Sequence, residues 1–302
     1  MQATHDDRLD QPMKWRSARQ SSNIEDRRGM RPVRKAGGLG LGGIIVVVVI
    51  GLLLGKNPLE MLGLVAQMQG GSSGGGTVDQ PVGPAPGNDE ARQFVASILG
   101  ESEDIWRQIF SASGSQYQDA ALVMFSGQVQ SACGTADAAV GPFYCPGDRK
   151  VYLDTSFFEQ MRTRLGGGGD FAEAYVIAHE IGHHVQTLTG TTRQVQEARR
   201  RGQSVEGADG PLVRQELQAD CFAGVWAYHA QQRHRWLEAG DIEEALSTAS
   251  AIGDDRLQRQ ARGTVVPDSF THGSSAQRVR WFKRGFESGQ AGQCDTFSAR
   301  DL

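Results

Sequence analysis

The chain has 302 residues, which is enough for one large domain with additional segments. Its net charge of −4 is unevenly distributed, because residues 1–35 carry nine Lys and Arg against five Asp and Glu, whereas the remainder carries 22 against 30. The acidic remainder has neither a basic stripe nor a recognisable nucleic-acid-binding motif, so nucleic acid is not an expected partner.

A long uncharged segment follows the basic N-terminal residues. No charged residue occurs over the 20 positions from Ala36 to Gly55, and Ile44–Leu54 is almost wholly aliphatic. This is the length that a helix needs to cross a bilayer. We therefore expect a cytoplasmic tail over residues 1–35 and one transmembrane helix over residues 36–55. The basic flank predicts a cytoplasmic N-terminus and a body in the periplasm or outside the cell.

Two other interpretations of this segment are weaker. A cleaved signal peptide would have a shorter basic region and a small-residue cleavage site directly after the apolar run. A buried helix of a soluble protein would be destabilised by the five glycines that precede Ile44. A single-pass membrane protein is therefore the expected arrangement.

A linker and then the folded body follow the apolar segment. Residues 56–87 end in GGSSGGGTVDQPVGPAPG, a stretch without the means to bury a core. The body is expected over residues 88–302. It should begin with a helix that Asn88 or Asp89 caps, continue through short strands between residues 120 and 154, and be mostly helical thereafter.

The first of the later helices carries a pattern that favours a metal site. We expect this helix to run from about residue 171 to residue 189 and to end at Gly190. His179 and His183 lie four residues apart, so both imidazoles share one helix face and can bind one metal ion. Glu180 can reach a water molecule on that ion.

A second helix, beginning at Pro211, is expected to supply the third metal ligand. Glu216 and Asp220 are four residues apart and therefore lie on one face of this helix. A catalytic zinc site needs three protein ligands and one open position, and Glu216 is the candidate third ligand. Asp220 can accept the other N–H group of a ligand histidine. The alternative is that both are ordinary solvated carboxylates.

The two motifs, AYVIAHEIGHHVQ and QELQADCFAG, resemble those of gluzincin metallopeptidases, including the prenyl-protein and heat-shock membrane proteases. Over nearly its full length, the chain resembles the bacterial putative neutral zinc metallopeptidase family, with KWRSARQSSNIEDRRG, CGTADAAVGPFYCPGDRKVYLD and THGSSAQRVRWFKRGFESG as further matching segments. The resemblance implies that His179, His183 and Glu216 bind Zn²⁺ and that Glu180 is the general base. It also implies that Asp220 contacts a metal ligand without binding the metal itself.

Two further roles concern the transition state and the substrate. Thr271-His272-Gly273, with Arg278 six residues after His272, resembles a His-Pro-x(4)-Arg motif of the prenyl-protease group, although Gly273 replaces the proline. His272 is thus the candidate donor to the oxyanion. The alternative is that His272 caps a helix and Arg278 forms a structural ion pair. Residues 148–154 are the candidate edge strand for binding a peptide by β-addition, with an internal strand as the alternative.

All four cysteines follow the apolar segment, where the expected topology places an oxidising compartment. Four cysteines allow three pairings. We expect Cys133 to pair with Cys145, and Cys221 to pair with Cys294. Two buried free thiols are the alternative.

The expected fold is α+β. A gluzincin-like helical lobe carries both motifs and packs on a small, mostly antiparallel sheet, preceded by one transmembrane helix. The expected function is that of a membrane-anchored zinc endopeptidase acting on protein or peptide substrates, with Zn²⁺ favoured by the His₂Glu ligands. A catalytically silent metal-binding scaffold for envelope proteins and a zinc hydrolase of non-peptide amides are the alternatives. Glu180 favours an enzyme, because a structural zinc site does not need it.

Overall fold

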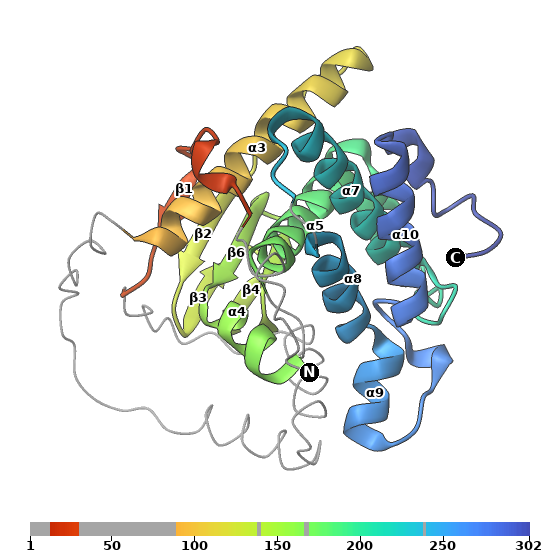
Figure 1. The fold of residues 1–302 in the computed structure, drawn as a ribbon. Coiled ribbons are helices and arrows are strands. Elements are labelled where there is room, and N and C mark those ends of the chain that lie inside the picture. Colours follow the sequence, from red (N-terminus) through yellow and green to blue (C-terminus); the bar gives the residue numbers. More distant parts are fainter. Residues whose placement is uncertain (1–12, 30–88, 138–139, 166–168, 238–239) are drawn as a thin grey trace, which may run out of the picture.

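The computed structural model describes residues 13–29, 89–137, 140–165, 169–237 and 240–302. The fold is a helix-rich α+β arrangement in which α5 lies between a small sheet and the other C-terminal helices (Figure 1). The longer helices are α3 (Glu90–Ala112), α5 (Asp170–Thr189), α6 (Thr191–Arg200), α7 (Pro211–His234), α8 (Asp241–Ala251), α9 (Asp254–Arg262) and α10 (Ser275–Ser288). Short helical segments are η1 (Trp15–Ser17), α4 (Ser156–Gln160), η3 (Met161–Leu165), η4 (Pro267–Ser269) and η5 (Ala291–Cys294).

Two small sheets complete the described part of the chain. The first is four-stranded with the order β1-β2-β6-β5, and the second is the antiparallel hairpin of β3 and β4. The strands are β1 (Ile24–Asp26), β2 (Ala121–Phe125), β3 (Gln128–Ser131), β4 (Gly134–Asp137), β5 (Phe143–Cys145) and β6 (Lys150–Asp154).

The expectation of a mostly antiparallel sheet is wrong for the four-stranded sheet. β1 and β6 both run parallel to β2, and only β5 runs antiparallel to its neighbour β6. The hairpin and β5 lie between β2 and β6 in sequence, so the chain returns to the same end of the sheet before β6 begins. In both β2 and β6 the last four residues are buried, which is the pattern of strands covered on both faces.

The candidate substrate-binding strand also needs correction. β6, which occupies most of residues 148–154, is internal, with β2 on one side and β5 on the other. β1 forms one edge of the sheet and β5 forms the other, and β5 is the edge strand that contacts α5. The last four residues of KVYLD are buried because both faces of β6 are covered. The sequence of a strand does not reveal which other strands lie beside it.

Residues 13–29 pack against the folded body. The expectation that residues 1–35 form a separate tail is therefore wrong for residues 13–29. Met13 and Trp15 are buried with only 2% and 3% exposure, and Trp15 packs edge-on against Phe94 of α3. β1 pairs with β2, with Ile24 opposite Leu122. The sequence pattern missed this strand because it is three residues long and lies before the apolar segment.

No helix within the described ranges is long and apolar enough to cross a membrane. The transmembrane helix expected at residues 36–55 and the linker expected at residues 56–87 lie outside those ranges. Both remain predictions.

Three helix boundaries lie where the sequence predicts them. Asp89 caps α3 by accepting a hydrogen bond from the backbone N–H of Arg92 at 3.2 Å. α5 ends at Gly190, whose φ of 93° is left-handed and suits glycine. α7 begins at Pro211.

Both expected disulfides are present. Cys133–Cys145 joins the turn of the β3–β4 hairpin to β5. Cys221–Cys294 joins α7 to η5, a segment that follows α10. No free cysteine occurs in the described ranges. One disulfide therefore anchors the edge strand, and the other anchors the helix that carries Glu216.

Candidate metal centre and active site

Three side chains from α5 and α7 converge on one point. Nε2 of His179 lies 3.2 Å from Oε2 of Glu216, and Nε2 of His183 lies 3.5 Å from the same oxygen. One potential ligand atom from each residue lies within 4.8 Å of the other two. Tetrahedral zinc with ligands at 2.0–2.1 Å places neighbouring ligand atoms about 3.3 Å apart, so the donor set fits a zinc ion.

A close contact between the two helices brings these ligands together. Gly182 of α5 faces Ala219 of α7, and a Cβ atom on Gly182 would lie 3.0 Å from the Cα and O atoms of Ala219. A larger residue at position 182 would push the helices apart. Since Gly182 lies between the two histidines in sequence and Ala219 is three residues after Glu216, this contact limits how far apart the two parts of the cluster lie.

The electrostatics of the cluster favour a cation. Burial by itself favours the neutral form of His179, but Asp220 and Glu216 outweigh it and raise its pKa to about 10. Burial likewise works to raise the pKa of Glu216, yet the adjacent imidazoles of His183 and His179 hold it well below its usual range. Glu216 is therefore anionic, and a metal ion could replace the protons of the two imidazoles as its counter-charge.

His179 is held in one orientation by Asp220. Oδ1 of Asp220 lies 2.9 Å from Nδ1 of His179, which leaves Nε2 for the metal. Asp220 is fully buried and also bonds Arg278 and Tyr175. Burial alone would raise the pKa of Asp220, but Arg278 and His179 hold it at about 2. The structural ion pair considered for Arg278 is thus present, and its partner is the residue that orients His179.

Glu180 is buried beside the cluster, with 8% of its surface exposed. Burial raises the pKa of its carboxyl group, and the positive charges of His183 and His179 and a backbone hydrogen bond from Tyr144 oppose the rise. A carboxylate whose pKa is raised towards neutrality is better suited to accept and return a proton. Its position on α5 directly follows His179, as the motif predicts.

His184, the residue after His183, is fully buried and joins α5 to the edge strand β5. Its Nε2 lies 2.6 Å from the carbonyl oxygen of Gln118, so Nε2 carries the hydrogen. Nδ1 therefore accepts the hydroxyl hydrogen of Tyr144, which lies 3.0 Å away on β5. Sequence reasoning missed Tyr144, whose only signal was the FYC segment before the second cysteine.

His272 lies near the cluster but is not one of its three converging donors. Its loop packs on α7, since a Cβ atom on Gly273 would lie 3.1 Å from Val213 and 3.2 Å from Leu217. The backbone N–H of His272 donates to Asp254 at 2.6 Å, and its imidazole is 48% exposed. His272 does not cap α10, because Ser274 does so.

Two crossing helices with a His₂Glu cluster and a buried glutamate after the first histidine define a metal site of the kind that zinc hydrolases use. The chain belongs to the putative neutral zinc metallopeptidase family, whose model matches residues 13–297. The matched range includes residues 13–29, in agreement with their place in the fold.

The chain is similar to two bacterial relatives. It is 46% identical over 296 residues to the uncharacterized protein YpfJ of Escherichia coli strain K12, covering 94% of this chain and 99% of the relative. It is 43% identical over 263 residues to the uncharacterized protein Rv2575 of Mycobacterium tuberculosis strain H37Rv, covering 78% of this chain and 86% of the relative. No solved structure matches.

Proposed function

We propose that this protein is a gluzincin-like zinc endopeptidase. The observation that carries the proposal is the convergence of His179, His183 and Glu216 with Glu180 buried beside them. A purely structural zinc site would be closed by a fourth protein ligand and would not need an adjacent general base. The donor set and the base together favour hydrolysis over scaffolding.

Each residue has a defined role in this proposal. Zinc, when bound, supplies Lewis-acid activation of a water molecule and of the substrate carbonyl. Glu180 accepts the proton of the attacking water and delivers it to the leaving amine nitrogen. Asp220 holds the imidazole of His179, and Arg278 keeps Asp220 anionic. His272, with its exposed imidazole beside α7, remains the candidate donor to the oxyanion.

The edge strand supports a protein or peptide substrate. β5 has β6 on one side only, and its residue Tyr144 faces both Glu180 and His184. An extended peptide can add to such an edge through main-chain hydrogen bonds, which would bring its scissile bond to Glu180. This arrangement favours a polypeptide over a small non-peptide amide.

The test compares the full chain with Glu180→Gln for bound zinc and for cleavage of unfolded casein. We expect about one zinc per chain in both proteins and cleavage by the wild type alone. Glu173→Gln, the same substitution elsewhere on α5, is the matched control and should retain cleavage. Zinc in both proteins without cleavage would support the scaffold instead, and absence of zinc would overturn the metal site.

We also propose that the protein is attached to a membrane through residues 36–55 and that its body lies in an oxidising compartment. The apolar length of that segment supports attachment. The disulfides Cys133–Cys145 and Cys221–Cys294 support an oxidising compartment, because such bonds are rare in the reducing cytosol.

The packing of residues 13–29 limits how the chain can enter a membrane. β1 pairs with β2, and Arg28 forms an ion pair with Asp89. The residues directly before and directly after the segment 30–88 therefore lie next to each other. A single crossing between them would put β1 and β2 on opposite sides of the bilayer. In place of the expected single pass with a cytoplasmic N-terminus, we propose that residues 13–29 and the body share one compartment.

A further inference from the structure

The second candidate metal ligand, His183, also has a fixed hydrogen-bond partner behind it. Nδ1 of His183 lies 2.9 Å from Oε1 of Gln186, one turn further along α5. Gln186 is fully buried. This contact is the counterpart of the one that Asp220 makes with His179, but it uses a neutral amide in place of a carboxylate.

The direction of this hydrogen bond follows from the groups that surround Gln186. Its Nε2 lies 2.6 Å from the backbone carbonyl oxygen of Gln215, which can only accept a hydrogen bond. The nitrogen end of the Gln186 amide must therefore face α7. Its oxygen end faces His183 and accepts a hydrogen bond from Nδ1.

A second side chain supports the same orientation. Nε2 of Gln186 lies 3.2 Å from Oε1 of Gln218, and Nε2 of Gln218 donates to the backbone carbonyl oxygen of Cys294 at 3.0 Å. Because a carbonyl oxygen cannot donate, it fixes the Gln218 amide, and that amide in turn presents its oxygen to Gln186. His183, Gln186 and Gln218 therefore each donate to the next group in a chain that ends at the carbonyl oxygen of Cys294. Cys294 is itself joined to α7 by the Cys221–Cys294 disulfide.

We propose that Gln186 is a positioning residue for the metal site: it selects the Nδ1–H tautomer of His183 and thereby presents Nε2 to the metal. The inference rests on the proposed zinc site, and it gives a role to a residue of the first motif to which the resemblance assigns none. Without Gln186 the imidazole would have two tautomers available, and only one of them offers a lone pair at Nε2. Gln186 also ties α5 to the backbone of α7 directly before Glu216.

Zinc affinity of the full chain, measured by competition with a chelator, tests the proposal without any assay of cleavage. Gln186→Met removes the acceptor and retains most of the volume, and we expect zinc to bind about 10–100-fold more weakly. Gln215→Met is the matched control. It makes the same change on α7, where only the backbone of residue 215 contacts Gln186, and should change the affinity less than about threefold.

A second variant separates orientation of the imidazole from packing. Gln186→Glu retains an acceptor for His183 but loses the donor to the carbonyl of Gln215. Its zinc affinity should remain near that of the wild type, while its Tm in the presence of chelator falls. If Gln186→Met does not fold, Gln186→Asn replaces it, because an amide shorter by one methylene withdraws its oxygen from His183.

Nitrogen NMR of the metal-free proteins gives an independent measurement. At a pH above the raised pKa of His183, where its imidazole is neutral, His183 should be the Nδ1–H tautomer in the wild type and a mixture in Gln186→Met or Gln186→Asn. Wild-type zinc affinity in these variants, or an unchanged tautomer, would overturn the role of Gln186. Failure of the wild type itself to bind zinc would refute the proposed metal site, whereas the NMR result would still decide whether Gln186 sets the tautomer.

Discussion

Asp220 and Arg278 form a two-point ion pair in the protein interior, with Oδ2 2.8 Å from Nε and Oδ1 2.9 Å from Nη2. The same Oδ1 is 2.9 Å from Nδ1 of His179 and accepts a hydrogen bond from the hydroxyl of Tyr175 at 2.5 Å. The carboxylate therefore balances a buried guanidinium and orients a candidate metal ligand. These two effects can be separated by mutation.

Asp220→Asn should reduce both stability and zinc affinity. Arg278 would remain buried without a counter-charge, which costs about 3–5 kcal/mol. His179 would lose its anionic acceptor, which should weaken zinc binding about 10–100-fold. Thermal unfolding in chelator measures the first effect, and zinc competition measures the second.

The double variant Asp220→Asn, Arg278→Met is the control for this experiment. It removes the unpaired charge, so we expect part of the lost Tm to return while zinc affinity stays as low as in the single variant. If zinc affinity recovers together with Tm, then Asp220 acts only through stability and does not orient His179.

Tyr144→Phe should weaken peptide binding and leave zinc bound. The hydroxyl holds β5 against α5 through His184, and a hydrogen bond of about 1 kcal/mol corresponds to about a fivefold rise in KM with a smaller change in kcat. Steady-state kinetics with zinc analysis measure the effect. Tyr117→Phe is the control, because this ring packs edge-on against the same imidazole with 5.6 Å between centroids. Equal effects of the two variants would argue against a specific role of β5.

Glu173→Gln should stabilise the protein at alkaline pH and have no effect at acidic pH. Burial raises the pKa of Glu173 to about 7, although Arg162 opposes the rise. The folded state therefore binds this proton more tightly than the unfolded chain, where the pKa is about 4.5. The destabilisation is absent below the unfolded pKa and develops fully as pH rises through about 7, to no more than about 3 kcal/mol.

Thermal unfolding at pH 5 and pH 8 checks this prediction. Tm of Glu173→Gln should exceed that of the wild type at pH 8 and approach it at pH 5. Glu159→Gln is the control, since its carboxylate is 63% exposed and pairs with the same arginine, Arg162. A gain in Tm of Glu173→Gln that is independent of pH would show that ionisation of this residue is not the cause.

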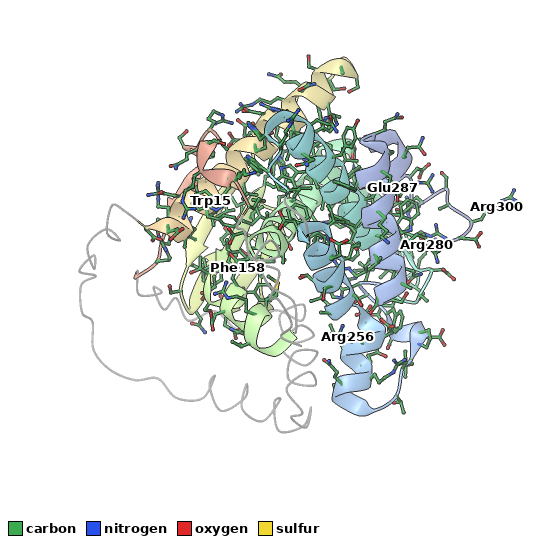
Figure 2. All side chains as sticks on the ribbon, viewed as in Figure 1. Trp15, Phe158, Arg256, Arg280, Glu287 and Arg300 are labelled. Carbon is green, nitrogen blue, oxygen red and sulfur yellow. A yellow bond between two sulfur atoms is a disulfide. The ribbon has the colours of Figure 1, made fainter. Side chains whose placement is uncertain are left out.

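The shared compartment of residues 13–29 and the body predicts equal labelling of two single cysteines. Gln20→Cys lies in the N-terminal segment, and Arg300→Cys lies at the C-terminal periphery, where Arg300 points away from the body (Figure 2). A membrane-impermeant maleimide applied to intact cells should label both or neither, and cell lysis should label both. Labelling of one variant alone would restore the single-pass arrangement.

The candidate site could be predicted from the sequence because its information is local. His179 and His183 are one helical turn apart, and so are Glu216 and Asp220, so helical spacing alone places each pair on one face. The boundaries of α5 and α7 follow from Gly190 and Pro211. The resemblance to a known family then connected the two helices, which spacing alone cannot do.

The remaining features depend on contacts between distant segments. Gln186 and His184 look like exposed polar residues on a helix, yet both are fully buried because α7 and the edge strand cover them. The sequence could not show that β6 is an internal strand, because its neighbours β2 and β5 are determined by how the whole sheet is assembled. β1 contributes three residues to a sheet whose other strands follow residue 120, and its short pattern gives no signal by itself.

The pairing of β1 with β2 also constrains the timing of folding during synthesis. Ile24 pairs with Leu122, 98 positions later, and translation at about 5–20 residues per second separates the two by about 5–20 s. β1 must therefore wait until β2 leaves the ribosome, and Trp15 must wait until Phe94 of α3 does. The N-terminal segment is thus made before the parts of the domain that hold it, and its contacts with α3, β2 and Trp236 form only as those parts follow.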